Sequence, residues 1–363
     1  MPADWQDGLF VGRIDQGEGP TPVVVRHGIV HDMTPVAPTV SALIAGGHFD
    51  GGSAIGPLEA LDAATLLSPI DLQCVKAAGV TFAVSALERV IEEQARGDHA
   101  RAGAVRGRLE AALGGGIRSV VPGTAEAAAL KAALIEQGMW SQYLEVAIGP
   151  DAEIFTKAPV LATMGWNAPV GIRSDSTWNN PEPEVVLVAD AQGRIVGATL
   201  GNDVNLRDFE GRSALLLGKA KDNNASCSLG PFVRLFDDGY GIDDVRRADV
   251  RMTIEGADGY VLEGASTMRE ISRDPEELLR QALSEHHYPD GLVLFCGTLF
   301  APTQDRDEAG RGFTHKVGDT VTIASERLGT LVNTVTTSRD APAWSFGIGD
   351  LMRNLARRGL LAA

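Results

Sequence analysis

The stretch NNPEPEVVLV, residues 179–188, joins a charged beginning to an apolar end. Its apolar run, VVLV, predicts a buried strand. Glu182 and Glu184 precede this run with a single proline between them. Because a strand points residues i and i+2 to the same face, the two carboxylates are expected side by side. Two such charges repel each other unless a positive group lies between them. The stretch therefore predicts a cation-binding site at the mouth of a strand.

Residues 190–193 (DAQG) separate this strand from the run RIVGATLG and consist of turn-forming types. A four-residue loop at this point predicts a hairpin in which Gly201 lies opposite Glu182, and Thr199 lies opposite the second glutamate. Asp203 then falls on the same face, diagonally next to Glu182. A one-residue bulge would send Asp203 to the other face, because side chains alternate along a strand.

In that register three carboxylates, those of Glu182, Glu184 and Asp203, converge over small residues. An oxygen-only set of ligands suits Mg²⁺, with Mn²⁺ or Ca²⁺ as possible substitutes, and does not suit zinc. The alternative interpretation is a solvated acidic strand end.

The composition limits the class of protein. The chain has 363 residues, 44% hydrophobic and 22% charged, which is typical of a globular protein. A net charge of −16 disfavours nucleic acid and anionic membranes as partners. We find no apolar run near the roughly 18 residues of a membrane span, and no signal peptide in MPADWQDGLFVGRIDQ. Three cysteines without metal-site spacing indicate reduced thiols, so a cytoplasmic location is expected.

The order of the expected elements predicts an α+β fold with mixed strands. Short β-rich runs between residues 9 and 45 predict a small β-rich N-terminal domain, placed at 1–70, ahead of a larger domain at 71–363. Strands predominate again after about residue 146. Helices are expected at 85–113, 125–138, 209–218 and 276–285.

From about residue 70 onward, the chain resembles the fumarylacetoacetate hydrolase family. The family's metal signature is a Glu-x-Glu on one strand followed by an Asp in an "N-D" turn, and GNDVNLRDFEGR supplies that Asp. The other matching motifs are Lys221 nine residues before Gly230-Pro231, the pair Gly297-Thr298, and the terminal pattern Gly318, Asp319, Val321, Ile323, Gly329, Leu331, Asn333 and Val335. Their order and spacing together are specific.

The resemblance implies a mixed β-roll or sandwich, a divalent metal held by Glu182, Glu184 and Asp203, and a homodimer or homotetramer. The block IRSDSTWNNPEPE is similar to the 2-keto-3-deoxy sugar-acid dehydratases within the family, which implies such an acid as the small-molecule substrate. The substrate-binding residues that it implies are Arg173, Ser174, Ser85, Gly297 and Thr298. Arg173 could instead form a structural ion pair with Asp175 or Glu182.

The departures from the family pattern favour dehydration. Many hydrolases of the family carry Tyr-x-x-His-x-x-Glu, whose histidine helps to activate water, whereas Phe82, Ser85 and Glu88 stand at these positions. Asn224 also replaces an aspartate of many members. Loss of water from the substrate needs no nucleophilic water, so the missing imidazole does not hinder it.

Two residues are expected to carry the chemistry. Lys221 is assigned to C3 proton transfer or to binding of the keto oxygen, with a pKa lowered by a nearby cation and by desolvation. Glu88 is assigned as an acid or base at the start of a helix. The alternatives are a metal-dependent hydrolase or decarboxylase of a 2-oxo or 1,3-diketo acid, and a non-catalytic sugar-acid-binding protein.

Overall fold

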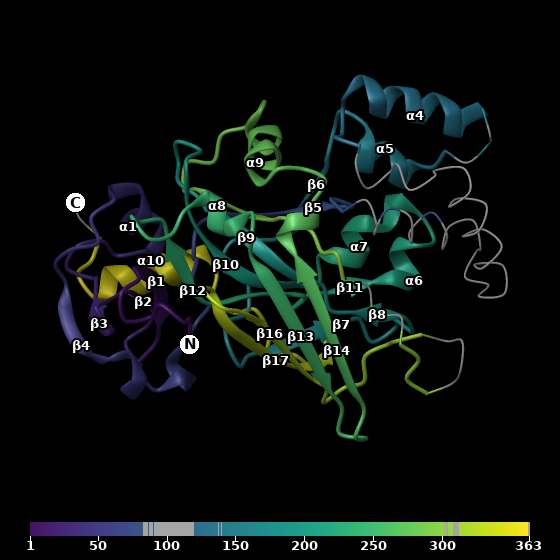
Figure 1. Cartoon of the computed structure of the whole chain (residues 1–363). Coiled ribbons are helices and arrows are strands. Elements are labelled where there is room, and N and C mark those ends of the chain that lie inside the picture. Colours follow the sequence, from purple (N-terminus) through teal and green to yellow (C-terminus); the bar gives the residue numbers. More distant parts are fainter. Residues whose placement is uncertain are drawn as a thin grey trace.

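The computed structural model of the chain describes residues 1–82, 86, 90, 120–136, 138, 140–300, 302, 304–307 and 312–361. Within this part, ten strands form one large sheet, and five form a second sheet (Figure 1). In order across the large sheet the strands are β4 (Ser53–Pro57), β3 (Ile29–Asp32), β2 (Thr21–Arg26), β1 (Phe10–Ile14), β12 (Cys227–Leu235), β10 (Ile195–Asp203), β9 (Pro183–Ala189), β15 (Leu292–Phe295), β5 (Cys74–Gly79) and β6 (Glu153–Ala158).

The second sheet packs on one face of the first. Its order is β14 (Val261–Thr267), β13 (Asp249–Glu255), β16 (Thr320–Ser325), β17 (Gly329–Thr337) and β7 (Pro169–Ile172). Val185 and Leu187 of β9 share a core with Ile323 and Leu331 of this second sheet. Val186 and Val188, which alternate with them along β9, lie in a separate core on the opposite face. Burial on both faces explains why the run VVLV is apolar without alternation.

The large sheet is strongly curved toward that opposite face. Lys157 of β6 forms an ion pair with Asp203 of β10 at 2.7 Å, although β9, β15 and β5 lie between their two strands in the sheet. Neighbouring strands are about 4.8 Å apart, so these two strands would lie far from each other in a flat sheet. The curvature therefore brings the ends of β6, β9 and β10 around one point.

The hairpin at 190–193 forms, but the predicted register is wrong by two residues. Ala189 pairs with Ile195, and a bulge before Gly197 adds a second one-residue offset. Gly201 consequently lies opposite Glu184, not opposite Glu182. Because the two offsets together amount to two residues, the side chains from Gly197 to Asp203 remain on their predicted faces.

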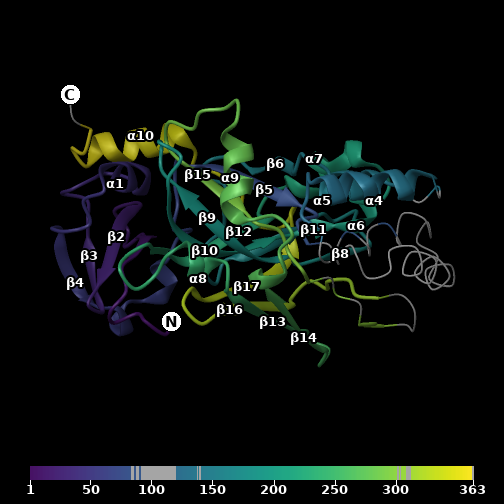
Figure 2. The same ribbon diagram turned by 45° about the horizontal axis from the view of Figure 1, so that its top comes forward.

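The N-terminal strands lie at the left of the molecule in Figure 1, on the same side as both chain ends. β1 pairs with β2 on one side and with β12 on the other, so the N-terminal strands continue the large sheet. Helices α1 (Val40–Gly46) and α10 (Ile348–Arg357) flank these strands, as the turned view in Figure 2 also shows. We propose the division into 1–70 and 71–363 as one between a small β-rich module and a larger body.

The remaining helices are short. The helix expected at 125–138 is α4 (Ala125–Glu136), and that at 276–285 is α9 (Pro275–Leu283), capped by the Asp274 side chain. The helix expected at 209–218 is broken into α6 (Arg207–Glu210), the 3-10 turn η4 (Ala214–Leu216) and α7 (Leu217–Lys221). Most of the segment 85–113 lies outside the described residues. The others are α5 (Gln142–Ile148), α8 (Ile242–Val245) and the 3-10 turns η1 (Leu58–Ala60), η2 (Ala63–Thr65) and η5 (Met268–Glu270).

Candidate metal centre

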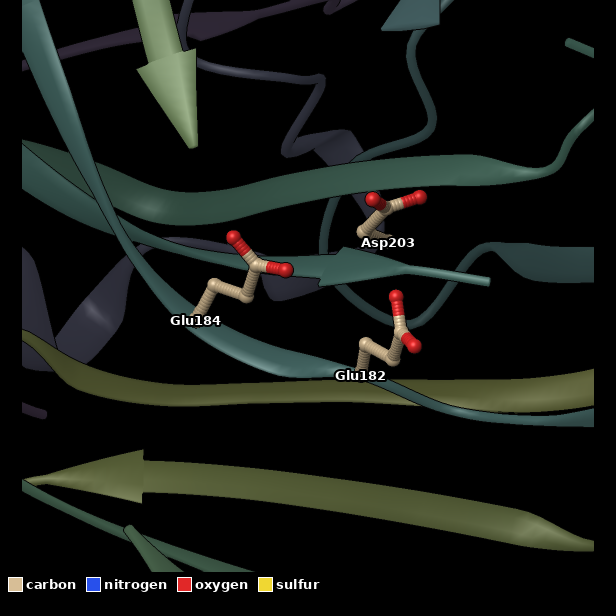
Figure 3. Close-up of side chains that lie close together, drawn as sticks. All are labelled: Glu182, Glu184 and Asp203. Atoms are coloured by element: carbon tan, nitrogen blue, oxygen red, sulfur yellow. The ribbon is translucent and has the colours of Figure 1, made fainter. Parts of the chain in front are cut away.

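Three buried carboxylates meet where β9 begins and β10 ends (Figure 3). Glu182 precedes β9, Glu184 lies on it, and Asp203 is the last residue of β10. One carboxylate oxygen from each lies within 4.8 Å of the other two. The convergence predicted from sequence is thus present in the structure.

The backbone explains this convergence. Asp203 N–H donates to the carbonyl of Glu182 at 3.0 Å, and Gly201 pairs with Glu184. Asp203 is therefore directly opposite Glu182, one step closer than the diagonal position that the sequence predicts. Directly opposite residues in a sheet have Cβ atoms about 5 Å apart, which lets their carboxylates share one ion.

Lys221, the last residue of α7, lies against two of these carboxylates. Its ammonium donates to Glu182 Oε2 and, at 3.0 Å, to Asp203 Oδ2. Burial alone would lower the pKa of Lys221, but the negative charges of Asp203 and Glu182 outweigh burial and raise it above its ordinary value. The lowered pKa expected from sequence concerns a lysine beside a bound cation and stays a prediction. Lys221 is an ammonium ion between two carboxylates.

Lys157 is a second buried cation, which the sequence analysis missed. Its side chain is 0% exposed; it forms an ion pair with Asp203 at 2.7 Å and donates to the carbonyls of Val204 and Lys221 at 3.1 and 2.5 Å. Burial alone would raise the pKa of Asp203, but Lys157 and Lys221 hold it below its ordinary value. A lysine in the otherwise β-like run EIFTKAP was the available signal.

Glu184 carries the least compensated charge of the three carboxylates. Burial, followed by repulsion from Asp203 and Glu182, raises its pKa well above the ordinary value. The backbone N–H of Gly297 donates to its Oε2 at 2.6 Å. An oxygen-only set of ligands with excess negative charge, buried at strand ends, fits a divalent cation such as Mg²⁺.

Gly297 occupies a position that only glycine fits. Its φ is +89°, and a Cβ would lie 2.0 Å from the hydroxyl oxygen of Thr81. Because its N–H is engaged by Glu184, a direct role of Gly297 toward a substrate carboxylate stays a prediction. Thr298, which follows it, is partly buried, and its hydroxyl accepts from the backbone N–H of Phe300 at 3.1 Å.

A further layer of polar side chains surrounds Glu182. Asn205 donates from Nδ2 to Glu182 Oε1 at 3.0 Å and to Glu210 Oε2 at 2.6 Å. Asn205 lies on β11 (Asn205–Leu206), which pairs with β8 (Asn179–Asn180) in a two-stranded ribbon. The sequence analysis singled out neither Asn205 nor Glu210, because polar residues in a short ribbon give no periodic signal.

The predicted substrate-binding residues outside the centre differ in their surroundings. Arg173 donates from Nε and Nη2 to both oxygens of Asp175, each at 2.8 Å, and from Nη1 to Asn223 at 3.2 Å. This is the ion pair with Asp175 that the sequence left open, and not a pair with Glu182. Ser174 is exposed. Ser85 and Glu88 lie outside the described residues.

Residues 177–336 match the model of the fumarylacetoacetate (FAA) hydrolase C-terminal family. This segment contains both glutamates, Asp203, Lys221 and Gly297. The chain carries a fumarylacetoacetate hydrolase C-terminal domain. The family resemblance found in the sequence is thereby confirmed.

Two curated relatives match part of the chain. It is 35% identical over 202 residues to a "Probable 2-keto-3-deoxyxylonate dehydratase" of Haloferax volcanii, covering 56% of this chain and 66% of the relative. It is 31% identical over 183 residues to a "2-dehydro-3-deoxy-D-arabinonate dehydratase" of Saccharolobus solfataricus, covering 50% of this chain and 58% of the relative. The chain thus spans less than two thirds of the length of each of these relatives.

A solved structure of 2-keto-3-deoxy-D-arabinonate dehydratase, complexed with magnesium and 2,5-dioxopentanoate, has a similar fold. The TM-score is 0.63 at 21% identity, covering 91% of this chain and 98% of that one. The predicted fold class, an α+β fold of the fumarylacetoacetate hydrolase type, is confirmed. Within the described residues, every helix is too short or too polar to cross a membrane.

Proposed function

We propose that this protein is a metal-dependent dehydratase of a 2-keto-3-deoxy pentonate, most specifically 2-keto-3-deoxy-D-xylonate, and that it forms 2,5-dioxopentanoate (α-ketoglutarate semialdehyde). The observation that carries the proposal is the set of three buried carboxylates within 4.8 Å of one another, with Lys221 bonded to two of them. The names of both curated relatives support the substrate class, and the relative with higher identity supports the xylonate.

The reaction removes one molecule of water. A base takes a proton from C3, and the hydroxyl leaves C4 with a second proton as water. The unsaturated 2-keto acid then loses a proton from C5 and gains one at C3, which gives an enol between C4 and C5. This enol gains a proton at C4 and loses its hydroxyl proton to become the aldehyde. A Mg²⁺ ion held by Glu182, Glu184 and Asp203, with Mn²⁺ or Ca²⁺ as substitutes, would supply Lewis-acid stabilisation of negative charge on the keto oxygen.

Lys221 serves this reaction through its ammonium group. Two acceptors hold its Nζ at the centre, where it donates a hydrogen bond to the keto oxygen and stabilises the charge that develops after C3 loses its proton. Of the two roles expected from sequence, binding of the keto oxygen is the one that this geometry favours. Proton transfer at C3 requires Lys221 first to give up its proton.

The other roles follow the family motif. Glu88 supplies the acid or base at the C4 hydroxyl, and Thr298 and Gly297 bind the substrate carboxylate. Arg173, Ser174 and Ser85 bind the remainder of the sugar acid. Arg173 is suited to this role because, among the described residues, its Nη1 bonds to the uncharged Asn223, while Asp175 neutralises the rest of the guanidinium. We propose a cytoplasmic homodimer or homotetramer as the working form.

A panel of 2-keto-3-deoxy pentonates and hexonates tests the proposal, with the aldehyde product detected by a coupled aldehyde dehydrogenase. Dehydration of a pentonate in Mg²⁺, lost in EDTA and regained with added Mg²⁺, is the expected result. Release of pyruvate-type cleavage products in place of water would indicate the hydrolase or decarboxylase instead. Binding of the acids with no metal-dependent turnover of any of them would indicate a sugar-acid-binding protein.

A further inference from the structure

The face that carries the three carboxylates continues beyond them as one ladder of side-chain pairs. Gly201 pairs with Glu184, Asp203 lies opposite Glu182 through its N–H bond, and Asn205 pairs with Asn180. From one pair to the next, the residue number rises by two on one strand and falls by two on the other. The same antiparallel register therefore runs from β9 and β10 into the ribbon of β8 and β11, whose strands lie beside each other in Figure 1.

Alternate residues of an extended chain share a face, so the Asn180–Asn205 pair belongs to the face of Glu182 and Glu184. The contact from Asn205 Nδ2 to Glu182 Oε1, 3.0 Å, shows that this asparagine turns toward the carboxylates. The asparagine pair is the next rung of the ladder, about 6.6 Å along the strands from Glu182 and Asp203.

Both asparagines are buried, and in each the side-chain oxygen Oδ1 has no hydrogen-bond partner among the described residues. Asn180 is 2% exposed and Asn205 is 0% exposed. Within the described part of the chain, neither Asn180 Oδ1 nor Asn205 Oδ1 accepts a hydrogen bond. A buried polar atom without a partner is costly, so each such group in a native protein calls for an explanation.

The amide nitrogens show which end of each side chain is available. Asn205 Nδ2 donates to two carboxylates, which fixes its amide orientation and leaves Oδ1 as the open end. Asn180 Nδ2 donates to the carbonyl of Pro181 at 2.9 Å. Both open ends are therefore hydrogen-bond acceptors, and the ligand group that complements them is a hydrogen-bond donor without negative charge.

We propose that Asn180 and Asn205 form a hydroxyl-binding subsite that recognises the C4 or C5 hydroxyl of the substrate. This inference rests on the proposed function for the identity of the ligand. A five-carbon 2-keto acid whose carboxyl end lies at the metal centre carries its hydroxyls at the other end, in the direction of the next rung. Carbonyl oxygens accept hydrogen bonds from those hydroxyls and repel a second carboxylate. Asn180 and Asn205 thereby select polyhydroxy acids over dicarboxylic acids.

Asn180→Leu is the sharpest test, because Leu keeps the number and branching of the side-chain heavy atoms while removing the open oxygen, and because Asn180 makes no hydrogen bond to the carboxylates within the described residues. Isothermal titration in Mg²⁺ compares 4-hydroxy-2-oxobutanoate with 2-oxobutanoate, which differ only in the C4 hydroxyl. We expect the wild-type protein to bind the hydroxylated acid about 5- to 50-fold more tightly. Asn180→Leu should abolish this preference while changing the affinity for 2-oxobutanoate by less than about twofold.

Thermal unfolding provides a second readout that a structural asparagine would not give. Asn180→Leu removes an unpaired buried oxygen, which favours folding, together with the bond from Nδ2 to the carbonyl of Pro181, which opposes it, so the unfolding midpoint should change little. Asn354→Leu is the matched control, because Asn354 on α10 is also buried and donates to the carbonyl of Glu18 at 2.9 Å. That control should lower the midpoint and leave the ligand preference intact.

The outcomes separate the two proposals. No wild-type preference for the hydroxylated acid, or a preference that survives in Asn180→Leu, would overturn the subsite. A fall in the unfolding midpoint of Asn180→Leu with equal weakening of both ligands would assign Asn180 a structural role and would also overturn it. Failure of the wild-type protein to dehydrate any 2-keto-3-deoxy pentonate, with the binding preference present, would overturn the proposed reaction and leave the subsite standing.

Discussion

Asp203 and Glu182 are joined by a backbone hydrogen bond of 3.0 Å, from the N–H of the first to the carbonyl of the second. This bond makes them directly opposed residues, so their carboxylates and that of Glu184 face one point in the described structure. Two lysines from other elements, Lys221 of α7 and Lys157 of β6, neutralise Asp203. The arrangement leads to five predictions.

Glu184→Gln should weaken metal binding and stabilise the metal-free protein. The substitution removes one of three anionic oxygen ligands, and we expect the affinity for Mg²⁺ to fall by at least about 10-fold. It also removes the charge that Asp203 and Glu182 repel. Titration with Mn²⁺ or Mg²⁺ and thermal unfolding in EDTA measure the two effects. Equal metal affinity in the variant would show that Glu184 is not a ligand.

The stability of the metal-free protein should decrease as the pH rises above about 4.5. The pKa of Glu184 is raised well above its ordinary value of 4.5 by burial and by its two acidic neighbours. A carboxyl whose pKa is higher in the folded chain favours folding when protonated, and this contribution is lost as the pH rises from the unfolded toward the folded pKa. The pKa of Asp203 is lowered, so Asp203 acts in the opposite direction, and only below its ordinary value of 3.8.

Unfolding midpoints measured in EDTA across this pH range test the prediction. Glu184→Gln should show a flatter dependence, and added Mg²⁺ should reduce the slope in the wild-type protein. A wild-type slope identical to that of the variant would exclude Glu184 as its source.

Lys221→Met should retain metal binding and lose the chemistry. Removal of the ammonium leaves Glu182 and Asp203 with one fewer cationic partner, so Mg²⁺ affinity should be unchanged or higher. Dehydration, and exchange of C3 protons with deuterated solvent, should each fall about 10²- to 10⁴-fold. Wild-type rates of C3 exchange in the variant would remove Lys221 from this step.

Glu88→Gln should block a different step of the reaction from the one that Lys221→Met blocks. If Glu88 is the acid for the C4 hydroxyl, C3 exchange persists in this variant while release of water fails. Proton exchange followed by magnetic resonance and aldehyde formation followed by the coupled enzyme give the two rates. Loss of both in equal measure would assign Glu88 to the C3 proton instead.

Lys157→Met should destabilise the fold. Lys157 is fully buried, pairs with Asp203 and donates to the carbonyls of Val204 and Lys221. Removal of one partner of a buried ion pair typically costs about 3–5 kcal/mol. Denaturant unfolding measures the loss, with Lys76→Met as a control, because Lys76 is bonded to Thr156 at 2.8 Å in an exposed position. Equal stability of the two variants would contradict a supporting role for Lys157.

The sequence by itself determined the parts of this protein that depend on local pattern. The apolar run 185–188 fixed a strand buried on both faces, and the spacing of Glu182 and Glu184 placed two carboxylates on one face. The motifs from Glu182 to Gly297 identified the family, which the match over residues 177–336 confirmed. Even the error in the hairpin register did not move Asp203 to the wrong face, because two one-residue offsets restore the two-residue period.

Only the tertiary structure decided which groups balance the charges of the centre. The raised pKa of Lys221 results from Asp203 and Glu182, which approach it from β10 and from the start of β9. The sequence alone supports the opposite direction, because burial and a nearby cation lower the pKa of a lysine. Lys157 reaches Asp203 only because the sheet curves until β6 approaches β10. Contacts between strands that are separated in the sheet depend on its curvature, which no local pattern of residues encodes.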